Sequence, residues 1–287
     1  GGGAPPGFSN LGNTCYLNAT LQCLAYLPTF CQCVATLPPP STASSSLAAS
    51  SPRGGGDGPP RAKTSAGQRI TMMLRSLLRR AHGLDDAGNR DDEGKGRSSG
   101  RSSAAISPKA IVRAVPSLGR TAGGRGGYKF RPGRQEDAHE FLVHLLDAMN
   151  DGELRAAGID QRISGWRDRL PVPRLDETTF VHRIFGGYLR SQVQCTRCGY
   201  RSNTYDPFLD LSLEVSKKSA RSVSTAFGEF TRRETLDADN MWKCSGCSKR
   251  VRATKQLTVF RPPLSLCVQL KRFAFGGGGA FGGGGGG

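Results

Sequence analysis

The stretch GFSNLGNTCYLNATLQCLAYLP, from Gly7 to Pro28, joins a polar turn rich in Asn and Gly to an apolar run. From Tyr16 onward the apolar residues recur at helical spacing, and Pro28 closes the run. The apolar positions are Leu17, Leu21, Leu24 and Ala25. The pattern predicts a helix whose N-terminus lies at or beside Cys15.

This position has a chemical consequence for Cys15. Unpaired backbone N–H groups and the positive end of a helix dipole favour a thiolate over a thiol, so a cysteine placed there can act as a nucleophile. The alternative is an inert cysteine, because free cysteines are among the most buried residues in proteins. We interpret Cys23, Cys31 and Cys33, which follow in or just past the same helix, as cysteines of that buried kind. Position alone leaves both readings of Cys15 open.

The composition bounds the class of protein. The 287 residues, 37% of them apolar, suffice for one large domain or two small ones. The chain begins at Gly1 and ends in a glycine run, so we expect an incomplete chain. We find no apolar run of membrane-spanning length and no signal-peptide pattern, and therefore expect an intracellular protein of the cytoplasm or nucleus with no membrane partner.

The formal net charge of +17 suggests a nucleic-acid binder, but its distribution argues against one. Between residues 38 and 127 there are 15 Lys and Arg against 6 Asp and Glu, in sequence rich in Ser, Gly and Pro. We expect residues 38–64 and 83–105 to be disordered, since charges strewn through such sequence more often serve solvation than binding. An electrostatic contact between this basic insert and RNA or an acidic partner remains open.

Three further segments have helical periodicity. Apolar residues at i, i+3, i+4, i+7 and i+8 predict an amphipathic helix over 67–82 that packs on the core. A short helix is expected from Ser107, as N-cap, to Val115. The clearest helix is RQEDAHEFLVHLLDAM, residues 134–149, in which one face is apolar and Glu136 and Asp137 lie in the first turn.

After about Phe180 the apolar period changes to two, as expected for strands. Leucine and valine alternate with polar residues over 209–215 and again over 264–270. Helices followed by strands predict an α+β fold with an antiparallel sheet.

Four cysteines form two pairs of the same spacing, CTRC (Cys195, Cys198) and CSGC (Cys244, Cys247). Each pair offers half of a tetrahedral four-sulfur Zn²⁺ site, and the small residues Gly199 and Ser248 suit the sharp turn that follows. The alternatives are redox CxxC motifs or unliganded thiols, but no thioredoxin-like βαβ pattern surrounds the pairs. We predict a closed, structural zinc site at the tips of two hairpins.

These segments resemble those of one family, the ubiquitin-specific proteases. GFSNLGNTCYLNATLQCL resembles the family's cysteine box, and RQEDAHEFL resembles its QQDAHEFL helix. IFGGYLRSQVQCTRCGYRSNTYDPFLDLSL resembles the segment that enters its zinc-bearing fingers. KCSGC resembles the second zinc knuckle, and LSLCVQLKRF resembles the strand that leaves it. The resemblance implies a papain-like fold of helical thumb, antiparallel β palm and zinc-bearing fingers, with the last palm strands missing. It implies a deubiquitinase that cleaves the isopeptide bond after the C-terminal glycine of ubiquitin, in protein turnover or signalling.

The resemblance also implies roles for individual residues. Cys15 matches the nucleophile, and Asn10 matches the side chain that donates to the oxyanion. The side chains that match the contact with ubiquitin's basic tail are Gln135, Asp137 and Glu140, whose other reading is helix capping and solvated surface. His139 matches a packing or hydrogen-bonding position rather than a base.

The chain departs from the family pattern in one respect. A thiol protease needs a base, usually histidine, and none of His82, His139, His144 and His182 lies in a matching motif. We therefore hold open an active deubiquitinase with an incomplete chain, a ubiquitin-binding pseudoenzyme, and a basic zinc-ribbon nucleic-acid binder. The expected segments are the cysteine-box start (1–37), the basic insert with one helix (38–127), the thumb helix and linker (128–179), the fingers and palm (180–275) and a glycine-rich tail (276–287).

Overall fold

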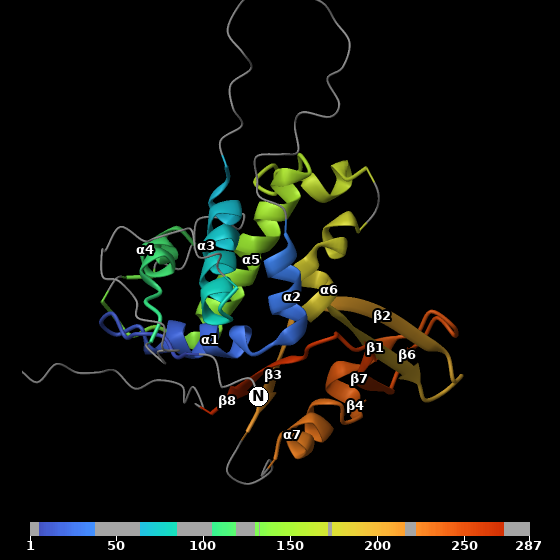
Figure 1. Ribbon diagram of the computed structural model, residues 1–287. Coiled ribbons are helices and arrows are strands. Elements are labelled where there is room, and N and C mark those ends of the chain that lie inside the picture. Colours follow the sequence, from blue (N-terminus) through green and yellow to red (C-terminus); the bar gives the residue numbers. More distant parts are fainter. Residues whose placement is uncertain are drawn as a thin grey trace, which may run out of the picture. The chain divides into compact units, whose positions relative to one another are not determined.

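The computed structural model describes residues 6–37, 64–84, 105–118, 130–131, 133–171, 174–215 and 222–272. The chain separates into two compact units, residues 1–181 and 182–287, which we describe one at a time (Figure 1). Nearly all of the low-complexity segments 38–64 and 83–105, and the whole tail 276–287, lie outside the described residues. No helix in the described part of the chain is both long and apolar enough to span a bilayer.

The first unit is helical. Its α-helices are α1 (Cys15–Ala25), α2 (Pro28–Thr36), α3 (Ala66–Ala81), α4 (Lys109–Leu118) and α5 (Ala138–Ala156), and its 3₁₀-helices are η1 (Trp166–Arg169) and η2 (Leu175–Thr178). The helix expected over 67–82 is α3, which begins with a reciprocal capping box between Ser65 and Gln68. Its apolar face is fully buried at Ile70, Leu74, Leu77 and Leu78.

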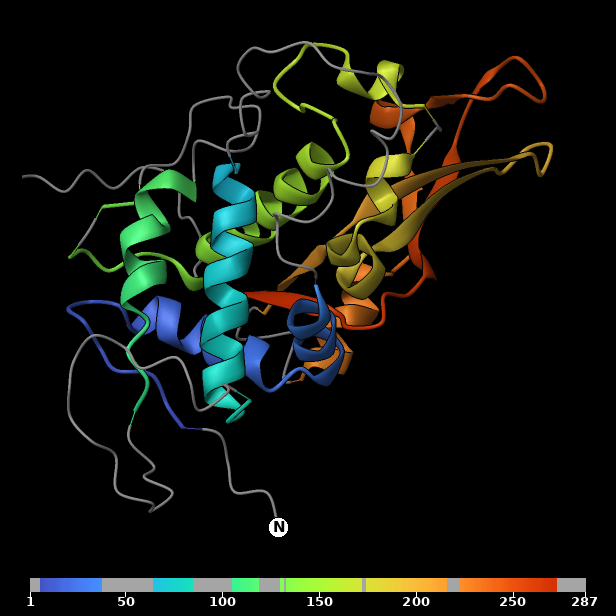
Figure 2. The ribbon, with the colours of Figure 1, turned by 45° about the horizontal axis from the view of Figure 1, so that its top comes forward.

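Helices α3 and α5 lie side by side (Figures 1 and 2) and cross at two glycines. A Cβ atom added to Gly152 would lie 2.6 Å from backbone atoms of Gly67 and Gln68. A Cβ atom on Gly67 would collide with the carbonyl oxygen of Ala148. The two backbones therefore touch directly, which only residues without a side chain permit.

Helix α5 differs from the predicted 134–149 at both ends. It begins at Ala138 because the Asp137 carboxylate accepts hydrogen bonds from the N–H groups of His139 and Glu140, which makes Asp137 the N-cap rather than a first-turn residue. It continues to Ala156 because the polar residues after Met149 find partners inside the unit. Asn150 accepts from the Thr179 hydroxyl at 2.6 Å, and Asp151 pairs with Arg155 at 2.7 Å.

Two other helix boundaries also differ from the prediction. Helix α1 already ends at Ala25, and Pro28 instead begins α2, as the favoured first residue of a helix. Helix α4 begins at Lys109 and runs past Pro116 to Leu118. The predicted N-cap at Ser107 is wrong, because its buried hydroxyl makes no hydrogen bond.

The second unit is built on strands, with α6 (Phe180–Phe185) crossing the boundary. An antiparallel sheet of order β2-β1-β7-β4 contains β1 (Gly187–Cys195), β2 (Arg201–Phe208), β4 (Glu234–Leu236) and β7 (Ala253–Arg261). A second hairpin pairs β5 (Trp242–Lys243) with β6 (Arg250–Val251). The unit also contains α7 (Val223–Phe230) and η3 (Ala238–Asn240).

The two strands with the clearest alternation pair with each other. In β3 (Asp210–Glu214), Leu211 and Leu213 are buried as the period of two predicts. However, β3 lies parallel to β8 (Cys267–Lys271), so the expectation of a wholly antiparallel sheet is wrong for this pair. Alternation fixes which face is buried but not the strand direction, and the long connection between the two strands allows a parallel crossover.

Candidate active site and metal centre

The turn before α1 is organised around the side chain of Asn10. Its Oδ1 atom accepts hydrogen bonds from the backbone N–H groups of Gly12 (3.1 Å) and Thr14 (3.2 Å) and from the Thr14 hydroxyl (3.1 Å). Gly12 and Asn13 both have positive φ, 92° and 51°. Glycine and asparagine tolerate this conformation best, which explains the LGNT sequence of the turn.

Cys15 is the first residue of α1, as the sequence predicts, and its side chain is exposed. The Thr14 carbonyl accepts from the N–H of Asn18, which starts the helical hydrogen-bond ladder. The turn therefore presents the exposed Cys15 thiol at the positive end of the helix.

The same turn is fastened to the start of α5. The Asn13 side chain donates to the carbonyl oxygen of Gly133 at 2.7 Å, and the rings of Tyr16 and Phe141 meet edge to face with centroids 5.6 Å apart. The Thr20 hydroxyl lies 3.3 Å from the carbonyl oxygen of Ala138. The sequence reading missed Asn13, although an asparagine in a GNT turn is a signal for the left-handed conformation.

Three acidic or amide residues predicted to bind substrate lie at this end of α5. Gln135 and Asp137 are exposed in the segment that leads into the helix, and Asp137 serves as the N-cap. Glu140 lies in the first turn, is exposed, and has Oε2 3.8 Å from Nε2 of His144. The fastening through Asn13 and Tyr16 places this segment next to the turn that holds Cys15.

The other cysteines of α1 and α2 differ from their predicted burial. Cys23 is exposed, while Cys31 and Cys33 are half-buried and belong to α2. The Cys31 thiol donates to the carbonyl oxygens at the end of α1, and burial raises its pKa. The interpretation as buried cysteines is therefore wrong for Cys23.

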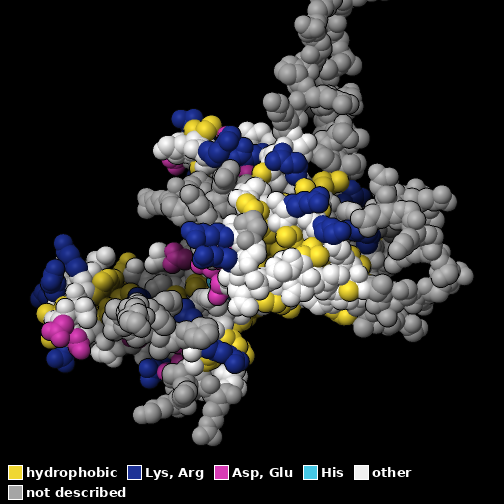
Figure 3. All heavy atoms as spheres, turned by 90° about the vertical axis from the view of Figure 1, so that its left-hand side faces the viewer, with side chains coloured by type: hydrophobic (Ala, Val, Ile, Leu, Met, Phe, Trp, Pro, Cys, Tyr) yellow, Lys and Arg dark blue, Asp and Glu magenta, His cyan; other side chains and the backbone are white. Residues whose placement is uncertain are grey.

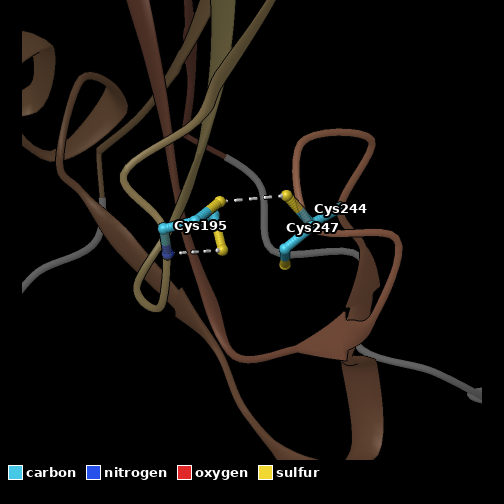
Figure 4. Close-up of side chains that lie close together, drawn as sticks. Cys195, Cys244 and Cys247 are labelled. Atoms are coloured by element: carbon cyan, nitrogen blue, oxygen red, sulfur yellow. Dashed lines mark hydrogen bonds between the residues drawn. The ribbon is translucent and has the colours of Figure 1, made fainter.

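The four predicted metal ligands come together in the second unit. The sulfur atoms of Cys195, Cys198, Cys244 and Cys247 all lie within 4.8 Å of one another, and those of Cys198 and Cys244 are 3.6 Å apart. A tetrahedral zinc site with Zn–S bonds of about 2.3 Å has sulfur atoms about 3.8 Å apart. The cluster, with separations of up to 4.8 Å, is close to this size, and its four sulfurs could hold a metal ion. The pairs lie at the ends of two hairpins, β1–β2 and β5–β6, and their sulfurs face one another (Figure 4).

The backbone of each hairpin tip turns toward sulfur. Gly199 and Ser248, the residues after each pair, have positive φ of 73° and 56°. The N–H of Cys198 lies 3.4 Å from the sulfur of Cys195, and the N–H of Gly246 lies 3.3 Å from that of Cys244. Backbone hydrogen bonds, the one from Cys198 foremost, lower the pKa of the Cys195 thiol to about 7. The Cys195 thiolate is therefore favoured, and thiolate is the form that binds metal. Cys198 shows the opposite shift: the N–H of Tyr200 acts to lower its pKa, but burial and hydrogen bonds to the other three cysteines outweigh this and raise the pKa to about 11.

Comparison with known proteins identifies relatives. The family described as ubiquitin carboxyl-terminal hydrolase matches residues 6–279. Human ubiquitin carboxyl-terminal hydrolase 42 is 34% identical over 273 residues, which cover 95% of this chain and 16% of the human protein. Ubiquitin carboxyl-terminal hydrolase 23 of Arabidopsis thaliana is 35% identical over 268 residues, which cover 93% of this chain and 25% of that protein. The chain thus spans a quarter or less of the length of these two relatives.

Solved structures share the fold. The SAGA Ubp8/Sgf11/Sus1/Sgf73 DUB module bound to ubiquitin aldehyde matches with a TM-score of 0.61 and 22% identity, over 93% of this chain and 47% of that chain. A SAGA DUB module with a cysteine-to-alanine variant of Ubp8, bound to monoubiquitin, matches with a TM-score of 0.62 and 22% identity, over 93% of this chain and 48% of that chain. The α+β fold expected from the sequence is therefore confirmed.

Proposed function

Because this chain belongs to the ubiquitin carboxyl-terminal hydrolase family, we propose that it hydrolyses the isopeptide bond after the C-terminal glycine of ubiquitin, with Cys15 as the nucleophile. One observation carries the proposal. The exposed Cys15 thiol begins a helix, and three hydrogen bonds fix the amide of Asn10 in the turn just before it. A nucleophile beside a preorganised amide is the arrangement that acyl transfer requires.

In the proposed reaction the Cys15 thiolate attacks the carbonyl carbon of the ubiquitin glycine. The carbonyl oxygen becomes an oxyanion, which accepts a hydrogen bond from Nδ2 of Asn10. Collapse of this intermediate forms a thioester with Cys15 and releases the lysine amine, which takes up a proton. Water then hydrolyses the thioester and frees ubiquitin and the thiol. We assign the base to none of the chain's four histidines, because none matches the family's motif.

We propose that Gln135, Asp137 and Glu140 contact the basic C-terminal tail of ubiquitin. All three are exposed at the start of α5, and the two carboxylates can pair with arginine. Asp137 can do so while it caps the helix, because its Oδ1 accepts both cap hydrogen bonds and Oδ2 takes no part in them. Ubiquitin and ubiquitinated proteins are thus the proposed partners.

We propose that the cysteine cluster holds a structural Zn²⁺. Four thiolates fill a tetrahedral coordination sphere and leave no position for a reacting water. The metal would join the β1–β2 and β5–β6 hairpins, the second of which is short: β5 and β6 have two residues each. Cys195, Cys198, Cys244 and Cys247 act only on the stability of this region.

The proposal is tested with the full-length protein and a fluorogenic ubiquitin–lysine isopeptide. Cys15→Ser should abolish hydrolysis, whereas Cys23→Ser should leave it unchanged. The two variants form a matched pair, because both cysteines are exposed and lie in α1. Hydrolysis that survives Cys15→Ser, or that is lost in Cys23→Ser, would refute the assignment.

Two other results would favour the alternatives left open by the sequence. Ubiquitin binding without hydrolysis in the wild-type protein would identify a pseudoenzyme, as expected if no base is supplied. Ubiquitin-independent RNA binding with a steep salt dependence would identify a nucleic-acid binder. On the face displayed in Figure 3, Lys and Arg side chains of the described residues lie in several groups, and Asp and Glu side chains lie beside some of them. A cytoplasmic or nuclear location is part of the proposal.

A further inference from the structure

We propose that Thr14 is a positioning residue that holds the oxyanion donor Asn10 in its working orientation. This inference rests on the proposed function and adds a residue to its machinery. Thr14 precedes the nucleophile, and its side chain is buried, with 5% of its surface exposed. It is therefore placed to act on the reaction through Asn10 rather than by touching the substrate.

The position of Thr14 is that of a helix cap, but its side chain does not cap the helix. Thr14 is the N-cap of α1 and makes no side-chain cap hydrogen bond. The N-cap residues of α3, α5 and α7, which are Ser65, Asp137 and Ser222, all accept from N–H groups of their own helices. Threonine is a common N-cap residue because of that bond. At α1 the Thr14 hydroxyl instead forms hydrogen bonds with Leu11 and Asn10 in the preceding turn.

The proton on the Thr14 hydroxyl can be assigned from its neighbours. The N–H of Leu11 donates to Oγ1 of Thr14 at 3.0 Å, so Oγ1 is the acceptor in that bond. A hydroxyl has one proton to donate, and Oδ1 of Asn10 lies 3.1 Å away. Thr14 thus links the Leu11 backbone to the Asn10 side chain.

The orientation of the Asn10 amide follows from the same reasoning. The N–H groups of Gly12 and Thr14 point at the end of the amide that lies in the turn. Two N–H donors cannot face an NH₂ group, so the oxygen must lie inside and Nδ2 outside. The Thr14 hydroxyl adds a third donor at the oxygen, and Nδ2 of the exposed Asn10 is left to donate to an oxyanion.

The absence of a capping hydrogen bond from the Thr14 side chain has a second effect on the site. A threonine hydroxyl in the usual capping position would accept from the first N–H groups of α1, which lie beside the Cys15 thiol. Because Thr14 turns back toward Asn10, no N-cap side chain takes up those N–H groups. They stay available to the negative charge that develops where Cys15 attacks.

The test compares Thr14→Val, which removes the hydroxyl at nearly constant shape, with Thr14→Ser, which keeps it. In the full-length protein, Thr14→Val should lower kcat for the ubiquitin–lysine isopeptide about tenfold with little change in KM, a fraction of the loss when an oxyanion donor is removed. Thr14→Ser should retain kcat within about twofold of wild type. Thr71→Val is the matched control, because Thr71 is also buried and its hydroxyl bonds a carbonyl of α3.

Two further readouts separate positioning from a general structural role. In an Asn10→Ala background, Thr14→Val should reduce kcat by less than about twofold, because the group it positions is gone. Alkylation of Cys15 by iodoacetamide, followed by mass spectrometry, should keep its wild-type rate in Thr14→Val, because this displacement forms no oxyanion.

Several outcomes would overturn the inference while the proposed function stands. They are an unchanged kcat in Thr14→Val, an equal loss in Thr14→Ser, an undiminished loss in the Asn10→Ala background, or alkylation slowed as much as hydrolysis. A failure of the proposed function is distinct, because the wild-type protein itself would then hydrolyse no isopeptide, and the role of Thr14 would be refuted with it. Thermal melts of the variants show whether each one folds.

Discussion

Replacing Gly152 with alanine should force α3 and α5 apart at their crossing. The added Cβ atom would lie 2.6 Å from backbone atoms of Gly67 and Gln68, which is 0.8 Å less than the 3.4 Å at which ordinary contact begins. Neither partner is the end of a flexible side chain, so neither can move aside alone. The helices must separate by several tenths of an ångström along their packed faces.

The cost of this separation can be estimated from the side chains that α3 buries. Four of them, the fully buried leucines and isoleucine of its apolar face, are each worth about 2 kcal/mol by burial. A gap of about 0.5 to 1 Å loses roughly a quarter to a half of the contact energy, or about 2 to 4 kcal/mol in total. Alanine gains about 1 kcal/mol over glycine in a helix. The net destabilisation of the first unit is therefore about 1 to 3 kcal/mol.

Native-state hydrogen exchange measures this effect segment by segment. Amides of α3 and α5 should exchange about thirtyfold faster in Gly152→Ala, which corresponds to about 2 kcal/mol. Gly228→Ala in α7 is the matched control, because its added Cβ atom meets nothing within 4 Å. That variant should slow exchange in α7, by up to about 1 kcal/mol. Unchanged or slower exchange of α3 in Gly152→Ala would refute the direct backbone contact.

Three other predictions follow from the site. Asp137→Ala should destabilise α5 by about 1 kcal/mol through loss of its cap, seen as faster exchange of its first amides; unchanged exchange would contradict the cap. Iodoacetamide should modify Cys23 before Cys31, because the raised pKa of the half-buried Cys31 lowers its thiolate fraction at neutral pH. Peptide mapping that shows Cys31 modified first would contradict this order. Elemental analysis should find one zinc ion in the protein. The zinc should be released as pH falls, because protons compete with it for the thiolates. Zinc that persists in the double variant Cys198→Ser with Cys244→Ser would exclude the cysteine cluster as its binding site.

The sequence predicts the elements of this fold better than their ends. Period-two alternation places Leu211 and Leu213 correctly inside, and helical spacing locates α3 to within one residue at each end. The end of α5 is missed because Asn150 looks like a helix terminus until its buried partner Thr179 is known. Thr179 lies 29 residues away in the sequence, so local sequence does not reveal this contact.

In the candidate site, too, the features set by local sequence are predicted and those set by side-chain hydrogen bonds are missed. The shape of each cysteine pair is predictable, because its spacing and the small residue after it fix the geometry of the hairpin tip locally. The two pairs also converge as predicted, although they lie far apart in the sequence. The position of Cys15 is also local, at the start of α1. The roles of Asn13 and Thr14 are missed, because they depend on hydrogen bonds to Gly133 and to Asn10 that the pattern of residue types does not show. The papain-like architecture itself follows from the family resemblance, which the family match and solved structures confirm.

The central claim, that Cys15 is the nucleophile of a deubiquitinase, is tested most directly by labelling with ubiquitin that carries a C-terminal electrophile. The full-length protein is treated with this probe, digested and mapped by mass spectrometry. We predict one adduct, on Cys15, that is absent in Cys15→Ser and retained in Cys23→Ser. A protein that forms no adduct, or forms it on Cys23 or another cysteine, would contradict the account.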